Sequence, residues 1–150
     1  MKIIENFVDQ NFENEIIKMI PEKISNTKDR NQVIRYGARR PYPSDIKSDI
    51  IPDLFLSIKD IKFDSVTINE YKAGQKIDWH IDRQDAGKDI YIISLLSTAV
   101  LKFRKDNEVK EFTLPRYSLA VMSDELRYEW EHGLFAPLDR ISVVFRNSNK

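Results

Sequence analysis

The sequence predicts a mainly β fold of the α+β kind, a sandwich or jelly roll with an N-terminal cap of helix and loop packed against it. From residue 64 onward, short β-rich runs follow one another, and Gly, Pro or Asp-Asn turns separate most of them. The run Ile90–Leu96 is apolar on both faces, which suits a central strand between two layers. The predicted core strands are residues 65–71, 77–81, 90–97, 99–104, 109–114, 119–122 and 140–145.

The part before residue 64 is predicted to be helix and loop. Residues 9–20 should form a helix, because their apolar side chains recur at helical spacing and leave one mainly apolar face. Asp9 can cap its first turn, and Pro21 marks its end. Polar, irregular sequence then surrounds a short strand at 32–36, and Pro52 suits the first turn of a second, short helix.

Length and composition limit the class of protein. The 150 residues suit one domain, with a helix and lid region at about 1–63 and a β-core at about 64–146. The absence of cysteine excludes a disulfide scaffold, a zinc ribbon, an iron–sulfur cluster and a cysteine nucleophile. The 24 basic and 24 acidic residues balance, so binding of nucleic acid by bulk charge is not expected, although a local basic patch is allowed. No signal peptide or bilayer-spanning run is recognised, so we expect a soluble, cytoplasmic protein without a membrane partner. We also expect a monomer.

The two histidines of the chain suggest a metal site. His80 and Asp82 lie two apart on a predicted strand, so their side chains point the same way. His132 could complete a set of two histidines and one carboxylate, the facial triad of non-heme Fe(II) oxygenases. A His-x-Asp pair on a surface strand is the plain alternative.

The last predicted strand carries an unusual polar face. Arg140, Ser142 and Arg146 share one face, together with Val144. Such a face is costly if it is buried without partners, so it either faces solvent on an edge strand or holds an anion. Guanidinium groups pair with carboxylates bidentately, and 2-oxoglutarate is a dicarboxylate that also chelates Fe(II). On an earlier predicted strand Thr67, Asn69 and Tyr71 share a face, so an amide and a phenol could bind the same ligand.

Together these motifs resemble the AlkB family of Fe(II)/2-oxoglutarate dioxygenases over about residues 66–146. The matching motifs are Asn69-x-Tyr71 with Gly74, His80-x-Asp82, His132-Gly133 and Arg140-x5-Arg146. The resemblance implies a double-stranded β-helix (jelly-roll) core and a dioxygenase that uses Fe(II), 2-oxoglutarate and O2, with ascorbate as a stimulant. The implied metal ligands and catalytic residues are His80, Asp82 and His132. The implied 2-oxoglutarate ligands are Asn69, Tyr71, Arg140, Ser142 and Arg146.

The N-terminal part resembles a reduced nucleotide-recognition lid. Residues 28–47 contain six basic and two acidic side chains, which suits contact with phosphate and stacking of tyrosines on bases, or equally a solvated basic loop. DNA-repair members of the family carry a second acidic residue two positions after the metal Asp, where this chain has Gln84 followed by Asp85. The residues expected to contact substrate are Arg35, Tyr36, Arg39, Arg40, Tyr42, Gln84 and Asp85.

The predicted activity is hydroxylation or oxidative demethylation of alkylated bases in DNA or RNA, with nucleic acid as the partner. The target base would be single-stranded or flipped from its duplex. Residues 127–133 resemble a segment of the branch that hydroxylates modified uridines in tRNA, so modified tRNA is one alternative substrate. Protein, a small metabolite, and a catalytically silent nucleic-acid-binding jelly roll are the others.

Overall fold

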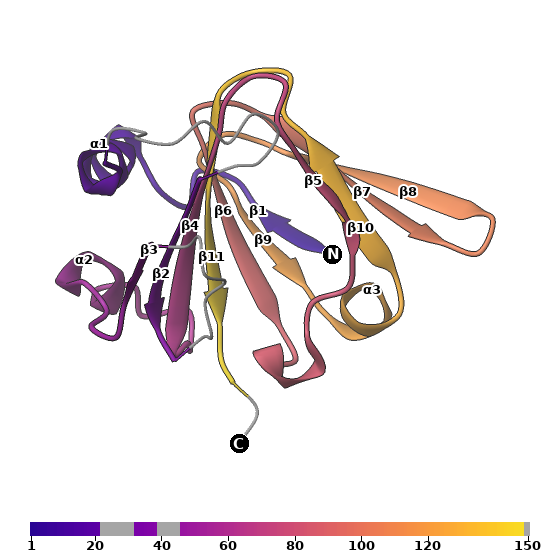
Figure 1. Cartoon of the computed structure of the whole chain (residues 1–150), viewed down its shortest axis with the longest axis horizontal. Coiled ribbons are helices and arrows are strands. Elements are labelled where there is room, and N and C mark those ends of the chain that lie inside the picture. Colours follow the sequence, from indigo (N-terminus) through magenta and orange to yellow (C-terminus); the bar gives the residue numbers. More distant parts are fainter. Residues whose placement is uncertain (22–31, 39–45, 149–150) are drawn as a thin grey trace.

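Two β-sheets pack face to face, and helices α1 and α2 cover the outer face of the larger sheet (Figure 1). A computed structural model describes residues 1–21, 32–38 and 46–148. The main sheet has the order β1 (Lys2–Ile4), β9 (Leu119–Met122), β6 (Ile90–Leu95), β11 (Arg140–Arg146), β4 (Ser65–Tyr71), β2 (Gln32–Gly37) and β3 (Ile46–Ser48). The minor sheet has the order β5 (Lys76–His80), β10 (Glu131–Phe135), β7 (Ala99–Lys105) and β8 (Glu108–Leu114).

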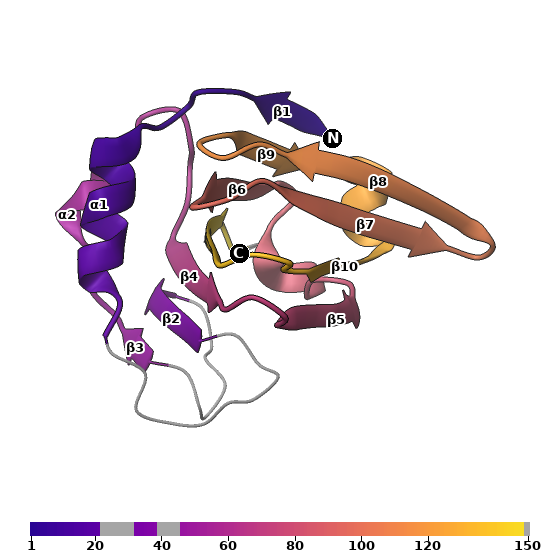
Figure 2. The ribbon, with the colours of Figure 1, turned by 90° about the horizontal axis from the view of Figure 1, so that it is seen from above.

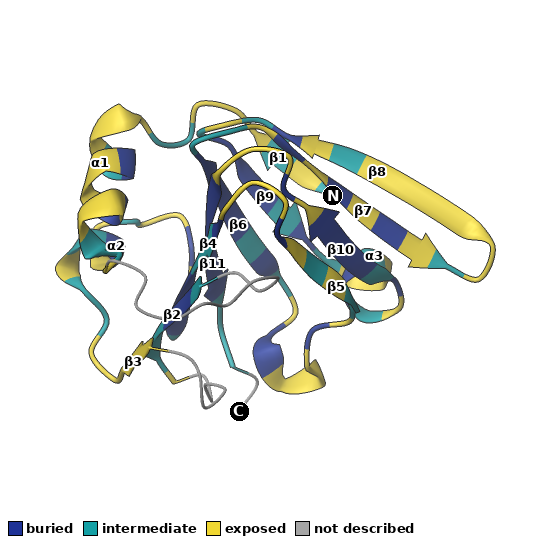
Figure 3. Ribbon diagram, turned by 45° about the horizontal axis from the view of Figure 1, so that its top comes forward, coloured by how far each residue is buried: buried dark blue, intermediate teal, exposed yellow. Residues whose placement is uncertain are grey.

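The space between the sheets holds one core and the polar site. Apolar side chains of the main sheet, such as Ile92 and Val144, meet Phe103 and Leu134 of the minor sheet. The strands that line this space are largely buried, whereas the far end of the β7–β8 hairpin projects into solvent (Figures 2 and 3). Ile141, Val143 and Phe145 face outward from β11, so the polar residues that alternate with them face inward.

The outer face of the main sheet carries the second core. Helix α1 (Gln10–Met19) inserts Ile16, and the short helix α2 (Asp53–Leu56) inserts Phe55, both fully buried. Asp9 caps α1 by accepting a hydrogen bond from the Phe12 amide at 3.0 Å, as the sequence predicts. In the described ranges no helix is long and apolar enough to cross a membrane.

The predicted strands of the core are all present, with ends shifted by a few residues. Among the described residues, five elements were not predicted: β1, β3, β10, the short helix α3 (Asp124–Tyr128) and the 3₁₀ turn η1 (Gln84–Ala86). Strands β1 and β3 are three residues long and depend on distant partners, β9 and β2, so no local pattern marks them. The mainly β, jelly-roll class predicted from the sequence is confirmed.

Candidate active site

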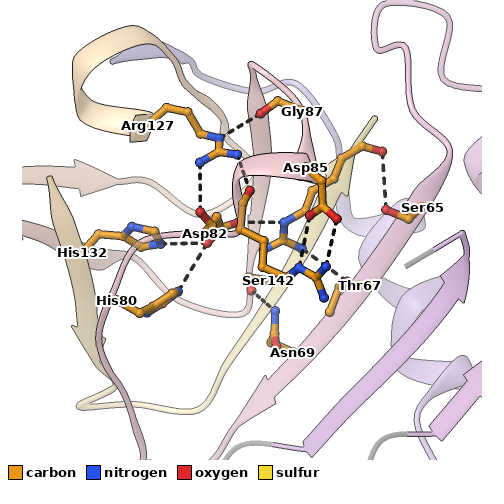
Figure 4. A network of polar contacts seen from close by, with 12 residues as sticks. Ser65, Thr67, Asn69, His80, Asp82, Asp85, Gly87, Arg127, His132 and Ser142 are labelled. Carbon is orange, nitrogen blue, oxygen red and sulfur yellow. Dashed lines mark hydrogen bonds and ion pairs between the residues drawn. The ribbon is translucent and has the colours of Figure 1, made fainter. Parts of the chain in front are cut away.

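His80, Asp82 and His132 meet between the two sheets. The end of β5 carries His80, the following loop carries Asp82, and β10 carries His132, which pairs directly with His80 across the strands. One Asp82 oxygen, Oδ1, lies 3.4 Å from His80 Nε2 and 3.5 Å from His132 Nε2 (Figure 4). The three ligand atoms lie within 4.8 Å of one another, so one ion can contact all three.

The protonation states of Asp82 and His132 suit a divalent cation. Burial would raise the pKa of Asp82, but the charge of Arg146 and the hydrogen bond with His80 hold that pKa well below its ordinary value. Burial lowers the pKa of His132 to about 4, against the attraction of Asp82. The site therefore holds an ionised carboxylate and a neutral imidazole, the forms in which these side chains bind metal.

A second layer of contacts orients these side chains. His80 Nδ1 donates to the Asp78 carbonyl at 2.7 Å, which turns Nε2 toward Asp82. Arg146 Nε donates to Asp82 Oδ2 at 2.7 Å, so the two carboxylate oxygens face different partners. Arg146 also lies 3.4 Å from Thr67 Oγ1, which places its guanidinium at the metal end of the site.

The other end of the site is a buried positive charge. Arg140 is 2% exposed, and its Nε and Nη1 atoms have no hydrogen-bond partner among the described residues. Burial lowers the pKa of Arg140 to about 10, so it remains charged near neutral pH. Strand β11 is central, between β6 and β4, so the alternative prediction that residues 140–146 form a solvent-facing edge strand is wrong.

Hydroxyl and amide groups surround this charge. Burial raises the pKa of Tyr71 against the charge of Arg140, so the phenol keeps its proton and can donate. Asn69 donates to Ser142 Oγ at 3.3 Å on the neighbouring strand (Figure 4). Ser94, opposite Ser142, and Ser118, opposite Ser94, continue the row across the sheet; both hydroxyls are fully buried and unpartnered within the described ranges.

This arrangement fits both groups that the sequence implies. A buried guanidinium with unused donors, a phenol and two unused hydroxyls suit the distal carboxylate of a dicarboxylate ligand. Two histidines and one carboxylate suit Fe(II), and they leave further coordination positions for the other end of that ligand.

The close packing of β10 against β5 explains why a glycine, Gly133, follows the metal-site histidine. Strand β10 lies closely against β5, and a Cβ at Gly133 would come 3.1 Å from the Ile77 carbonyl oxygen and 3.5 Å from the Trp79 ring. The indole of Trp79 therefore lies across the position that a side chain would occupy, on the face opposite His80. The close approach holds His80 and His132 side by side, with ring centroids 4.3 Å apart.

The expected substrate-contacting residues divide into three groups. Arg39, Arg40 and Tyr42 lie outside the described residues. Arg35 lies on the inner face, with Nη1 3.4 Å from Thr67 Oγ1, and Gln84 and Asp85 lie in the exposed loop after Asp82.

Tyr36 corrects one expectation. It packs against Phe55 on the outer face of the main sheet, with ring centroids 6.1 Å apart. Successive residues of a strand point to opposite faces, so Arg35 is the inward residue and Tyr36 the outward one. Stacking of Tyr36 on a base in the site does not fit this placement.

Two contributions to the site were missed in the sequence. Ser118 lies directly before β9, outside any strand, and becomes a site residue only because its carbonyl accepts a hydrogen bond from the Ser94 amide of β6. Arg127 is fully buried beside the loop that carries Asp82. A buried arginine has no local signal in a single sequence, although its place five residues before His132 could have drawn attention.

Comparisons with known proteins agree with this geometry. The profile of the 2OG-Fe(II) oxygenase superfamily matches residues 8–143. An uncharacterized protein, L905, of Acanthamoeba polyphaga mimivirus is 29% identical over 97% of this chain and 83% of its own length. The tRNA (carboxymethyluridine(34)-5-O)-methyltransferase ALKBH8 of Macaca fascicularis is 45% identical over 75 residues, which are 49% of this chain and only 11% of that protein. The Alkylated DNA repair protein ALKBH8 homolog of Arabidopsis thaliana is 30% identical over 56% of this chain and 30% of its own length.

A solved structure supports the fold. The structure of OsALKBH1 superposes with a TM-score of 0.69, covering 97% of both chains at 16% identity. The family implies Fe(II) and 2-oxoglutarate as the metal and the co-substrate, and the described residues contain a matching triad. The chain therefore belongs to the 2OG-Fe(II) oxygenase superfamily, as an AlkB-like member.

Proposed function

We propose that this protein hydroxylates or oxidatively demethylates a modified base in nucleic acid, with RNA as the favoured substrate class. One observation carries the oxygenase assignment. His80, Asp82 and His132 converge in the same inter-sheet space into which the buried Arg140 faces, and its Nε and Nη1 have no hydrogen-bond partner among the described residues. A silent binding module would have no need to retain an unpaired buried charge opposite an intact triad.

Each residue has a role in this proposal. His80, Asp82 and His132 hold Fe(II), and Arg140 binds the distal carboxylate of 2-oxoglutarate with Tyr71 and Ser142. Asn69 positions the Ser142 hydroxyl, and Arg146 holds Asp82 so that Oδ1 stays turned toward both histidines.

When bound, the metal and the co-substrate would supply oxidative decarboxylation of 2-oxoglutarate by O2, in which one oxygen atom enters succinate, CO2 leaves, and the other oxygen atom hydroxylates a substrate C–H bond. The chain excludes water around them. Phe103 lies 5.6 Å from the His132 ring, and Phe103 and Leu134 both belong to the dry core beside it. His80 is the more open ligand, with a side chain 34% exposed against 8% for His132, so substrate approaches from the His80 side.

RNA is favoured over the other substrates because of the ALKBH8 relatives. Two relatives that are 45% and 44% identical to this chain are named for an activity on a tRNA uridine, and each match covers 49% of this chain. Arg35 lies beside Thr67 on the inner face, near the metal end, where a basic side chain suits contact with a backbone phosphate. Alkylated DNA is the second candidate, supported by the name of the Arabidopsis relative.

Analysis of the nucleosides after reaction tests the proposal. The protein is incubated with Fe(II) and 2-oxoglutarate and, separately, bulk tRNA, methylated single-stranded RNA and methylated single-stranded DNA, and the nucleosides are analysed by mass spectrometry. We expect a nucleoside of the RNA arms to gain one oxygen or lose one methyl group. Change in the DNA arm alone would move the substrate to DNA, and no change in any arm would remove nucleic acid as the substrate.

A pair of variants controls for contaminating enzymes. His132→Ala removes a proposed ligand, and the product should disappear. Glu131→Gln changes the adjacent residue, which is exposed and paired with Arg104 on the opposite face, and the product should remain. The cytoplasmic location, the monomeric state and stimulation by ascorbate stay predictions.

A further inference from the structure

Arg127 is a buried arginine whose side-chain hydrogen bonds, among the described residues, go to one loop. It is 0% exposed and lies in α3. Its Nη1 donates to the Asp82 carbonyl at 3.2 Å, its Nη2 to the Arg83 carbonyl at 2.6 Å, and its Nε to the Gly87 carbonyl at 2.9 Å (Figure 4). These three carbonyls belong to the segment between β5 and β6.

The three carbonyls stand at the two ends of the loop. Asp82 and Arg83 begin it, Gly87 ends it, and the exposed 3₁₀ turn η1 (Gln84–Ala86) lies between them. One planar guanidinium therefore ties the start of the loop to its end. Asp82 lies just beyond the end of β5 and has no ladder hydrogen bonds of its own to fix its backbone.

The same short segment of chain carries His132. Arg127 lies in α3, and His132 lies five residues later in β10, which pairs with β5 at His80. The α3–β10 segment thus contacts the Asp82 backbone, supplies His132, and pairs with the strand that carries His80.

The charge of Arg127 is expensive where it lies. In the described part of the chain no carboxylate forms an ion pair with it, and its partners are neutral carbonyls and the face of Tyr128, whose ring centroid is 4.4 Å from Cζ. An apolar side chain would pack there at lower cost in desolvation. The three acceptors at both ends of the Asp82 loop suit a role for this arginine in the site.

We propose that Arg127 is a positioning residue for the metal centre, which fixes the backbone of the Asp82 loop so that Oδ1 of Asp82 reaches both histidines. The proposal rests on the metal centre of the proposed function. Lysine at this position keeps the charge but offers one point of donation, so it cannot hold both ends of the loop.

Titration with Co(II), followed by its visible absorption, tests the proposal without any turnover. We expect Arg127→Lys to weaken Co(II) binding by about tenfold or more, in the range found for residues that orient metal ligands, and to change the ligand-field spectrum. Arg104→Lys is the matched control, because Arg104 is half-exposed on the outer face over Trp79 and should leave the spectrum unchanged.

A second control separates positioning from stability. Leu114→Ala removes a fully buried side chain at the end of β8. Leu114 pairs with Ala99, whereas His132 pairs with Phe103 four residues further along β7. The change should therefore lower the stability without weakening Co(II) binding. If Arg127→Lys does not fold, Gly87→Ala tests the positioning role instead. Its Cβ would meet the Asn147 carbonyl oxygen and displace the Gly87 carbonyl, which accepts from Arg127, while Arg127 itself stays unchanged. It should weaken Co(II) binding as well.

The outcomes are distinct. Wild-type protein that does not bind Co(II) would contradict the metal centre itself. Wild-type protein that binds Co(II), together with a folded Arg127→Lys whose affinity lies within about twofold of it and whose spectrum is unchanged, would overturn the positioning role.

Discussion

The two carboxylate oxygens of Asp82 contact different groups of the site. Its Oδ1 faces both histidines, while its Oδ2 accepts from Arg146. The sequence predicts the pairing of His80 with Asp82, because strand spacing puts both on one face. It does not predict that Arg146 binds Asp82, because that contact joins residues 64 positions apart and depends on how two sheets close.

Arg140 allows function to be separated from stability at the residue scale. Replacing it with methionine removes an unpartnered buried charge, so the ligand-free protein should gain about 1 kcal/mol or more of unfolding free energy. The same change should abolish stabilisation by 2-oxoglutarate, which in the wild type reaches about 2.7 kcal/mol at a hundred times its Kd. Urea denaturation with Mn(II), with and without 2-oxoglutarate, measures both.

A control marks the specificity of the Arg140 effect. Arg104→Met removes a half-exposed arginine of the outer face and should keep the response to 2-oxoglutarate. An Arg140→Met protein that is still stabilised by 2-oxoglutarate to the wild-type extent would place the carboxylate elsewhere.

At the scale of elements, helix α1 is held to the sheet by one buried carboxylate. Glu13 is 2% exposed and accepts from the Leu96 amide at 2.8 Å and from Arg116 Nε at 2.9 Å. The hydrogen bonds from Arg116 hold the pKa of Glu13 below its ordinary value, although burial opposes them. The sequence predicts this helix and its cap but not the burial of Glu13, because the partners of Glu13 come from two distant loops.

Glu13→Gln should lower the unfolding free energy at pH 7 by about 1–3 kcal/mol, a value limited by the partial exposure of Arg116. A lowered pKa means that the wild-type stabilisation is complete above the unfolded pKa of about 4.5 and is lost as the pH falls through the lower, folded pKa. The difference between the two proteins in urea denaturation should therefore shrink below pH 4.5.

Glu15→Gln on the same helix is the matched control for this change. Glu15 is exposed, and its ion pair within the described ranges is with Lys18, so its effect should stay below about 0.5 kcal/mol at all pH values. A Glu13→Gln difference that grows toward acid pH would show that the carboxylate is not the stabilising group.

Strands β5 and β10 set the spacing of the two histidines, and Gly133 is the point of closest approach. Gly133→Ala should destabilise the protein by about 1–3 kcal/mol, because the new methyl group must push against the Ile77 carbonyl. It should also weaken Co(II) binding, because His80 and His132 lie on the two strands that separate. Loss of stability with an unchanged Co(II) affinity would mean that the strands adjust without moving the histidines.

For the whole molecule, periodicity predicts the class and most strands, because alternation and turn residues are local. Periodicity does not predict β10, because His132-Gly133 interrupts the alternation of polar and apolar residues there. Close packing of Gly133 against Trp79 is what positions this strand. The two ends of the site were predictable as separate motifs from matching faces. The distance between these two ends of the site, and the hydrogen bonds from Arg127 to the Asp82 loop, could not be predicted. Both arise only when the two sheets pack around a common core.

The central claim is that the space between the sheets is a working Fe(II)/2-oxoglutarate site whose turnover responds to RNA. The most direct measurement is succinate formed from labelled 2-oxoglutarate by wild-type and Asp82→Asn protein with Fe(II), in the presence and absence of bulk tRNA. We predict succinate from the wild type alone, at a rate that tRNA increases. Wild-type protein that binds iron and forms no succinate under either condition, or that forms no more than Asp82→Asn, would contradict it.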